Sequence, residues 1–261
     1  NIHMGNLKER AGRGEQVLGT MISEISCPNL PRILKAAGFE FFVVDCEHGY
    51  FDFSQLAAMI SVAKGAEIEA LVRIPTIERG IITKVMDMGA DGLLVPMVNT
   101  KEDAQKIVSF AKYPALGHRG ASTQRVHTNY NPPKLEEYFP IANNRTMIWV
   151  QIETGEAMGN LEEIASVEGV DVIMVGPNDL SIDLGTPGDL FSPVMTEAMK
   201  TVAKTAGRAG KASGILTSNM EAIRSCRSWG MNVISCDSEV GMLMKMAKSV
   251  VKKLSESDSE Q

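Results

Sequence analysis

Three ionisable side chains lie within four positions, directly after an apolar run. Asp45, Glu47 and His48 follow the residues FFVV. A histidine beside carboxylates can act as a general acid or base near neutral pH, because a carboxylate fixes the tautomer of its ring. Arg73 closes a second apolar run, ALVR, and a guanidinium there can hold a carboxylate or enolate oxygen. The alternatives are a solvated loop for the first cluster and an internal salt bridge for Arg73.

Two further carboxylates follow later apolar runs. Glu153 comes after MIWVQI, and Asp179 comes after VIMVGPN. Two carboxylates that converge repel each other, and a divalent cation is the usual remedy. Without a His or Cys ligand beside them, they favour a hard ion such as Mg²⁺ or Mn²⁺. Each could instead cap a helix or lie on the surface.

Eight short β-rich runs alternate with amphipathic stretches, which predicts an α/β fold, a (β/α)8 TIM barrel. The runs are mainly apolar, as expected of parallel strands that are covered on both faces. Active sites of such barrels form at the carboxyl ends of the strands, so the side chains above are expected to meet at one mouth. The predicted strands are 17–22, 41–45, 70–74, 92–96, 147–152, 170–175, 212–216 and 233–236.

Two connections are longer than usual for such a fold. Residues 113–145 and 178–193 are expected to be strand-to-helix loops that hold substrate at the mouth. His118 and His127 lie in the first of these loops and are weaker acid–base candidates than His48. No lysine ends a predicted strand, so a Schiff-base mechanism has no obvious nucleophile.

Composition narrows the classes of function. The 261 residues are 44% hydrophobic, which supports a large core, and the net charge of −6 argues against a nucleic-acid or anionic-membrane partner. No apolar run approaches the roughly 20 residues that span a bilayer, and no secretory signal is evident, so a cytoplasmic location is expected. Cys27, Cys46, Cys226 and Cys236 lack CxxC spacing and are expected to be reduced thiols.

A single barrel domain is expected over residues 5–254. Residues 1–4, Asn-Ile-His-Met, look like an expression scar. Residues 255–261 form an acidic tail without large apolar side chains, which should be frayed.

Formation of an enolate from a 2-oxo acid would unite the acids, the base and the arginine. A divalent ion would chelate the 2-oxo and carboxylate oxygens as a Lewis acid. Arg73 would stabilise the oxyanion, and His48 would move a proton on the other reaction partner.

At these residues the sequence resembles the HpcH/HpaI family of class II, metal-dependent 2-oxo acid aldolases, in the phosphoenolpyruvate/pyruvate barrel superfamily. The order and spacing of Gln-x-Glu-Thr, Glu-Gly-Val-Asp and Gly-Pro-x-Asp-Leu-Ser are specific. The resemblance covers nearly the whole chain, and its segments are VVDCEHGYFD, LVRIP, VMDMGADGLLVPMVNT, YPALGHRG, VQIETGEAMGNLEEIASVEGVDVIMVGPNDLSIDLG and GILTSN.

The resemblance implies a lyase that reversibly cleaves a 4-hydroxy-2-oxo acid to pyruvate and an aldehyde, with Mg²⁺, Mn²⁺ or Co²⁺ as cofactor. Glu153 and Asp179 look like the metal ligands, and Arg73 resembles the contact of the pyruvyl oxygen. His48 is similar to the family's acid/base, with Asp87 as its partner. The other site residues that it implies are the acidic residue Asp45 and a substrate-binding wall of Gln151, Gly176, Pro177, Asn178 and Leu216.

Members of this family exchange their last helix between subunits, so the resemblance implies a homo-oligomer, a trimer or a hexamer, with residues 240–254 exchanged. Alternatives for the same site are an oxaloacetate decarboxylase and a citrate-lyase-like acyl-CoA lyase; a non-catalytic barrel that binds a small acid is a third. Asn178 and Cys46 depart from the Ala and Gly that are common in the family. The aldehyde, the metal and the role of Glu47 are left open by the sequence.

Overall fold

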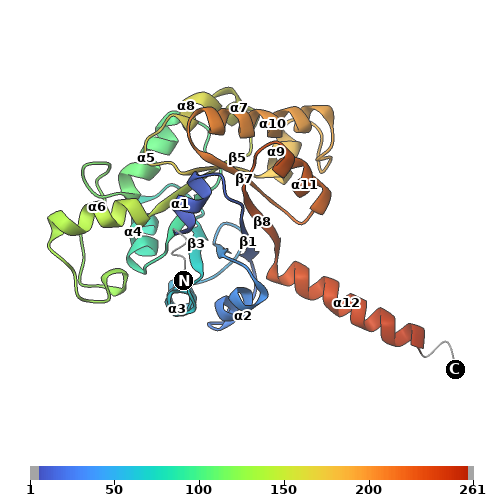
Figure 1. Cartoon of the computed structure of the whole chain (residues 1–261), viewed down its shortest axis with the longest axis horizontal. Coiled ribbons are helices and arrows are strands. Elements are labelled where there is room, and N and C mark those ends of the chain that lie inside the picture. Colours follow the sequence, from blue (N-terminus) through green and yellow to red (C-terminus); the bar gives the residue numbers. More distant parts are fainter. Residues whose placement is uncertain (1–5, 258–261) are drawn as a thin grey trace.

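The strands close into one parallel barrel in the computed structural model, which describes residues 6–257 (Figure 1). Each strand pairs with the next along the chain, and the last pairs with the first. The prediction of a (β/α)8 barrel is confirmed. The strands are β1 (Val17–Ile22), β2 (Phe41–Asp45), β3 (Glu69–Arg73), β4 (Gly92–Val95), β5 (Met147–Ile152), β6 (Val172–Val175), β7 (Ala212–Thr217) and β8 (Val233–Ser238).

Helices surround the barrel and return the chain from the carboxyl end of one strand to the amino end of the next. They are α1 (Leu7–Gly12), α2 (Leu30–Ala37), α3 (Phe53–Ala66), α4 (Arg79–Asp87), α5 (Lys101–Ala111), α6 (Leu135–Arg145), α7 (Gly155–Gly159), α8 (Leu161–Ala165), α9 (Pro177–Asp183), α10 (Pro193–Arg208), α11 (Met220–Ser228) and α12 (Glu239–Ser257), with a 3₁₀ turn η1 (Val126–Thr128).

The near-continuous apolar character of the strands follows from burial on both faces. In β2 and β5, Phe41 and Trp149 point into the barrel, where their rings meet edge to face with centroids 5.0 Å apart. Phe42 and Val44 belong instead to the larger core between the barrel and its helices. The inward-facing apolar layer closes the barrel below its carboxyl end and leaves that end to polar side chains.

One of the two predicted substrate loops is placed differently by the structure. Residues 113–145 follow α5, so they form a helix-to-strand connection, and they contain η1 and α6. The prediction was wrong because the connection from β4 to the following helix, α5, is only a few residues long. Residues 113–145 therefore come after that helix and lead to β5. Residues 178–193 do connect a strand to a helix, and α9 occupies their first part.

Helix α12 projects away from the barrel (Figure 1). It extends to Ser257, three residues into the expected tail. The expected scar, residues 1–4, and the rest of the tail, residues 258–261, lie outside the described residues. All four cysteines are free. Among the helices of residues 6–257, none has the length and apolar character needed to cross a membrane.

Candidate active site

Asp45 and Arg73 form a bidentate pair at the carboxyl ends of β2 and β3. The parallel register places the two residues opposite each other. Arg73 Nε donates to Asp45 Oδ1 at 2.9 Å, and Nη2 donates to Oδ2 at 2.7 Å. Burial opposes ionisation of Asp45, but the hydrogen bonds and charge of Arg73 outweigh it and hold its pKa below the ordinary value. The expected internal salt bridge of Arg73 is therefore present, inside the site.

Asp45 also shapes the loop that carries His48. Its Oδ1 accepts the backbone N–H groups of Glu47 at 3.0 Å and His48 at 3.3 Å. Glu47 Oε2 lies 3.4 Å from Arg73 Nε and 3.9 Å from His48 Nε2. The His48 side chain itself is 70% exposed, so it faces the open mouth. Burial raises the pKa of Glu47, and the positive charges of Arg73 and His48 offset this only in part.

Glu153 is 2% exposed and both of its oxygens are held. Gln151 Nε2 donates to Oε1 at 2.9 Å, and the backbone N–H of Met97 donates to Oε2 at 2.9 Å. Met97 reaches this position with a left-handed backbone, at φ +52°. Burial raises the pKa of Glu153 to about 7; the Met97 N–H opposes that rise, while the negative charges of Glu47 and Asp179 add to it.

Gly176 is required by the closeness of Glu153. A Cβ at position 176 would overlap Glu153 Oε1 and lie 2.7 Å from its Cγ. The φ of Gly176 is −95°, which any residue adopts, so space and not backbone conformation requires glycine. The residue lets β6 pass directly beside the carboxylate.

Asp179 lies exposed on α9, next to the buried Pro177 and the exposed Asn178. Its negative charge raises the pKa values of both Glu153 and Glu47, so the three acids share one electrostatic site. Over residues 6–257 no cation is paired with Asp179, and no three His, Cys, Asp or Glu side chains could hold a metal by themselves. The donors available here are two carboxylates, which suit a hard cation that keeps other oxygen ligands.

Two members of the predicted wall, Gln151 and Leu216, lie on barrel strands β5 and β7. Gln151 is 1% exposed, and its Oε1 has no partner within the described part of the chain. Leu216 is partly buried on β7 and packs with Met21 against the inward-facing core. The wall therefore combines one buried acceptor with an apolar side.

Asp87 is not brought to His48 within one chain. It ends α4, which returns the chain to the amino end of the barrel, whereas His48 lies at the carboxyl end. Asp87 Oδ1 instead accepts from Arg119 Nη2 at 2.7 Å and lies 3.7 Å from His127 Nε2.

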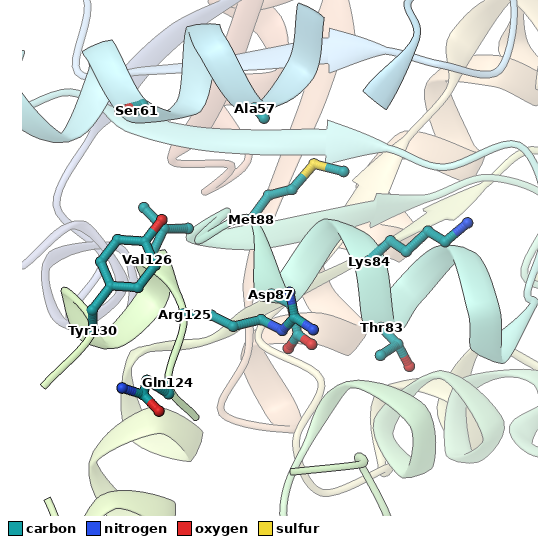
Figure 2. Close-up of a pocket in the computed structure, with 10 residues that line it drawn as sticks. All are labelled: Ala57, Ser61, Thr83, Lys84, Asp87, Met88, Gln124, Arg125, Val126 and Tyr130. Atoms are coloured by element: carbon teal, nitrogen blue, oxygen red, sulfur yellow. The ribbon is translucent and has the colours of Figure 1, made fainter. Parts of the chain in front are cut away.

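A cavity of about 680 Å³ opens beside Asp87, between α3, α4 and the segment around η1 (Figure 2). The two weaker histidine candidates also lie away from the mouth. His127 Nδ1 is 2.6 Å from Tyr138 Oη, and His118 Nδ1 is 3.2 Å from Ser109 Oγ. Neither is grouped with Arg73 or Glu153.

Sequence reasoning missed Met97, which acts through its backbone. The predicted strand 92–96 is followed by Met97 and Val98, whose apolar side chains give no sign of chemistry. No residue type marks a position whose N–H will meet a carboxylate, and a methionine with positive φ is uncommon. Only the fold reveals this contact.

Comparisons with known proteins agree with the geometry. A family model described as HpcH/HpaI aldolase/citrate lyase matches residues 21–245. Hydroxypyruvate/pyruvate aldolase of Roseovarius nubinhibens is 32% identical over 246 residues, which cover 94% of this chain and 95% of that protein. 5-Keto-4-deoxy-D-glucarate aldolase of Shigella boydii is 34% identical over 220 residues, which cover 84% and 85%.

A solved structure gives the same result. The HpcH/HpaI aldolase from Desulfitobacterium hafniense superposes with a TM-score of 0.92 at 32% identity, covering 97% of this chain and 98% of that one. Fold and sequence similarity over most of the chain thus agree. The chain belongs to the HpcH/HpaI aldolase/citrate lyase family of lyases.

Proposed function

We propose that this chain is a divalent-metal-dependent aldolase that cleaves a 4-hydroxy-2-oxo acid to pyruvate and an aldehyde, and catalyses the reverse addition. The observation that carries the proposal is the grouping of Arg73, Glu153 and Asp179 beside the exposed His48 at one end of the barrel. Two relatives are named for aldolase reactions, one of them with pyruvate in its name.

Glu153 and Asp179 fit a divalent cation. Their charges are close enough to raise the pKa of Glu153, and a cation between them would remove that repulsion. Such an ion supplies Lewis-acid polarisation of the 2-oxo group. Gln151 and the Met97 N–H each donate to one oxygen of the Glu153 carboxylate, which fixes the orientation of the carboxylate before substrate binds.

Arg73 is arranged to hold the oxygen that becomes negative during cleavage. Two of its nitrogens are engaged by Asp45, which fixes the plane of the guanidinium. Nη1 is left without a partner among the described residues and can donate to the C2 oxygen of the substrate. A hydrogen-bond donor that is fixed beside a developing oxyanion lowers the activation free energy of the reaction more than it tightens binding of the substrate ground state.

His48 is the group that can take the C4 hydroxyl proton. As that O–H bond breaks, the aldehyde C=O forms, the C3–C4 bond breaks and its electron pair becomes the enolate of pyruvate. Protonation of that enolate at C3 then gives pyruvate. The exposure of the His48 ring at the mouth supports this role, because the ring is open to an incoming substrate.

An assay of pyruvate release tests the proposal. The purified chain is incubated with 4-hydroxy-2-oxo acids, with oxaloacetate and with an acyl-CoA, with Mg²⁺, Mn²⁺ or Co²⁺ and with chelator. We expect metal-dependent cleavage of hydroxy-oxo acids, lost in His48→Ala without loss of pyruvate binding. Turnover of oxaloacetate or acyl-CoA alone would assign the chain to one of the two alternative activities, and the family's description includes citrate lyase.

The proposed enzyme is an oligomer, a trimer or hexamer in which α12 packs on another copy. Leu243, Met246 and Val251 on this helix are 57%, 65% and 63% exposed. An apolar groove of about 320 Å³ lies at the base of α12, along β8, β1 and α11. In a TIM barrel a helix covers this outer face of the last strand, and α12 projects away from it (Figure 1).

A second observation supports an oligomer. The pair of His48 and Asp87 implied by the resemblance cannot form within one chain, so it requires Asp87 of a neighbouring copy. Light scattering of the full chain should give a mass of three or six subunits. A triple variant, Leu243→Ser, Met246→Ser and Val251→Ser, should shift that mass downward; an unchanged mass would remove α12 from the interface.

A further inference from the structure

The first residue of α12 is anchored in a pocket of backbone donors. Glu239 is 5% exposed. Its Oε1 accepts the N–H groups of Ser23 at 2.8 Å, Glu24 at 2.6 Å and Ile25 at 2.9 Å. Its Oε2 accepts from Ser23 N at 2.9 Å and Ser23 Oγ at 3.2 Å. One carboxylate therefore fixes the whole segment 23–25, which follows β1.

Segment 23–25 in turn lies against the loop that carries His48. A Cβ on Gly49 would be 3.0 Å from the carbonyl oxygen of Ser23 and would overlap that of Asp45. The carbonyl oxygen of Asp45, in the same loop, is what mainly requires glycine there, and the 3.0 Å approach to Ser23 shows that the two loops are also in close backbone contact. Tyr50 Oη donates to Glu24 Oε2 at 2.8 Å, which adds a second tie between the loops.

We propose that Glu239 is a positioning residue for His48, acting through segment 23–25 and Gly49. The proposal rests on the proposed function in one respect, that His48 is the acid/base. It makes the position of the base depend on the residue that begins α12, so the C-terminal helix and the proton-transfer group are mechanically linked.

The reason is that little else holds His48. Its side chain is 70% exposed, and its backbone N–H reaches Asp45 Oδ1 only at 3.3 Å. Glu239→Gln would remove the negative charge that the three N–H groups share. It would also set an NH₂ donor where Oε2 accepts from Ser23 N and Ser23 Oγ, so segment 23–25 would rearrange to satisfy its donors. The loop in contact with it at Gly49 would follow.

Two reactions on the same enolate separate positioning of His48 from general damage. Cleavage of a 4-hydroxy-2-oxo acid requires a base for the C4 hydroxyl proton. Decarboxylation of oxaloacetate breaks a C–C bond to CO₂ and passes the electron pair to the same pyruvate enolate, with no hydroxyl proton to remove. It therefore needs Arg73, Glu153 and Asp179 but not the base.

The test compares Glu239→Gln with Glu221→Gln, which removes a carboxylate from the first turn of α11 that has no contact with segment 23–25. We expect Glu239→Gln to lower kcat for aldol cleavage about tenfold or more, because small displacements of a catalytic group are costly. KM for the hydroxy-oxo acid and the rate of oxaloacetate decarboxylation should stay near those of the parent. Glu221→Gln should match the parent in all three.

Hydrogen exchange gives a readout that does not depend on activity. Amides of residues 46–52 should exchange faster in Glu239→Gln than in Glu221→Gln. Unchanged exchange there, or equal loss of both reactions in a folded variant, would overturn the proposal. If Glu239→Gln fails to fold, Tyr50→Phe is the second test, because it removes the hydrogen bond between the two loops. This variant should lower kcat for aldol cleavage without lowering the rate of oxaloacetate decarboxylation. Parental kcat and parental exchange in Tyr50→Phe would refute the link between segment 23–25 and the His48 loop.

Failure of the proposed function gives a different pattern. A parent chain that cleaves no hydroxy-oxo acid, or a His48→Ala variant with full cleavage, contradicts the function and leaves the exchange result to judge the link. Loss of cleavage in His48→Ala, with parental cleavage and exchange in Glu239→Gln, contradicts only the positioning role.

Discussion

The two ends of the barrel treat their acidic side chains in opposite ways. At the amino end, Asp91 Oδ2 accepts the N–H of Ala70 and Asp171 Oδ2 accepts that of Ile148, each at 2.8 Å. Lys64 lies 3.5 Å from Asp91, and Lys8 lies 3.2 Å from Asp171. These acids tie the start of one strand to its neighbour and are neutralised by lysines of the same chain.

At the carboxyl end, Arg73 pairs with Asp45 and lies 3.4 Å from Glu47, but Glu153 and Asp179 have no paired cation among residues 6–257. Glu153 is gripped by Gln151 and Met97, and its pKa is raised to about 7, chiefly by burial and with a contribution from Asp179. Only Asp45 has a full bidentate partner, Arg73. Charges that a fold leaves uncompensated weaken it, and acids with perturbed pKa values are typical of functional sites, which supports the proposal that a ligand binds at the open end. On this proposal the amino end serves stability and the carboxyl end serves chemistry.

Removing one acid from each end gives the largest contrast. Glu153→Gln should lower metal-dependent kcat/KM about a thousandfold or more, because the loss of Lewis-acid stabilisation costs several kcal/mol. Its Tm at neutral pH should equal or exceed that of the parent, since burial disfavours the charged form. Asp171→Asn should do the reverse, with parental activity and about 1–3 kcal/mol less stability from a broken charged hydrogen bond. Thermal melts and pyruvate-release kinetics check both, and a Glu153→Gln variant active in chelator would contradict the comparison.

Arg73 is the one residue expected to affect both properties. Arg73→Met should lower kcat by about 10²–10³-fold through loss of an oxyanion donor. It should also cost about 3–5 kcal/mol, because Asp45 is left as a buried, unpaired charge. Adding Asp45→Asn should recover stability in urea unfolding without recovering activity. If the double variant recovers neither stability nor activity, or recovers both, then the stabilising role of the Arg73–Asp45 pair cannot be separated from the catalytic role of Arg73.

Gly176 tests how tightly the Glu153 carboxylate is confined. Gly176→Ala should weaken metal-dependent activity by about 10–100-fold, the range for a disturbed supporting contact. Gly207→Ala is the matched control, since Gly207 lies within α10 and an added Cβ meets nothing within 4 Å. The control should gain up to about 1 kcal/mol of stability from helix propensity. Titration of Mn²⁺ binding and urea unfolding measure both; equal metal affinity in the two variants would argue against close confinement.

The smallest effect on turnover is expected from Glu69, an amino-end acid with a large pKa shift. Burial, with the nearby charge of Asp91, raises its pKa from 4.5 to about 8. The folded chain therefore holds a proton that the unfolded chain releases, and stability falls as pH rises from 4.5 towards 8. Glu69→Gln cannot lose this proton. Its Tm should exceed that of the parent at pH 9 by roughly 2 °C or more for each kcal/mol that release of the proton costs the folded parent, and the difference should vanish near pH 4. A constant difference across that range would exclude Glu69 as its source.

Much of the barrel and its mouth could be predicted because parallel strands carry a strong local signal. The apolar runs that end at Asp45 and before Glu153 match β2 and β5, so the polar residues next to them were placed at the mouth. The strand predicted over 70–74 is observed at 69–73, and this shift of one residue still leaves Arg73 at the carboxyl end of the strand. Backbone groups were not predictable: the N–H of Met97 and those of segment 23–25 depend on how distant loops meet.

Residues 113–145 show where local signals fail. The length of this connection predicted a substrate loop at the mouth, although these residues follow α5 and include α6. Pro140 lies inside α6, which obscures the helical pattern of that segment. Asp87 was expected beside His48, but the direction of α4 places it at the other end of the same barrel.

The space between β5 and β6 makes two positions in the sequence interdependent. A carboxylate at 153 and a side chain at 176 cannot occupy the same volume, although the backbone at 176 would accept any residue. Substitution at 176 alone therefore lowers the activity of any descendant that keeps the acid. In a descendant that replaces the acid at 153, for example by serine, position 176 no longer has to be glycine. In a library that randomises codons 153 and 176, selection for folding alone should recover many combinations of residues at the two positions. Selection for turnover should favour one combination, glutamate at 153 with glycine at 176.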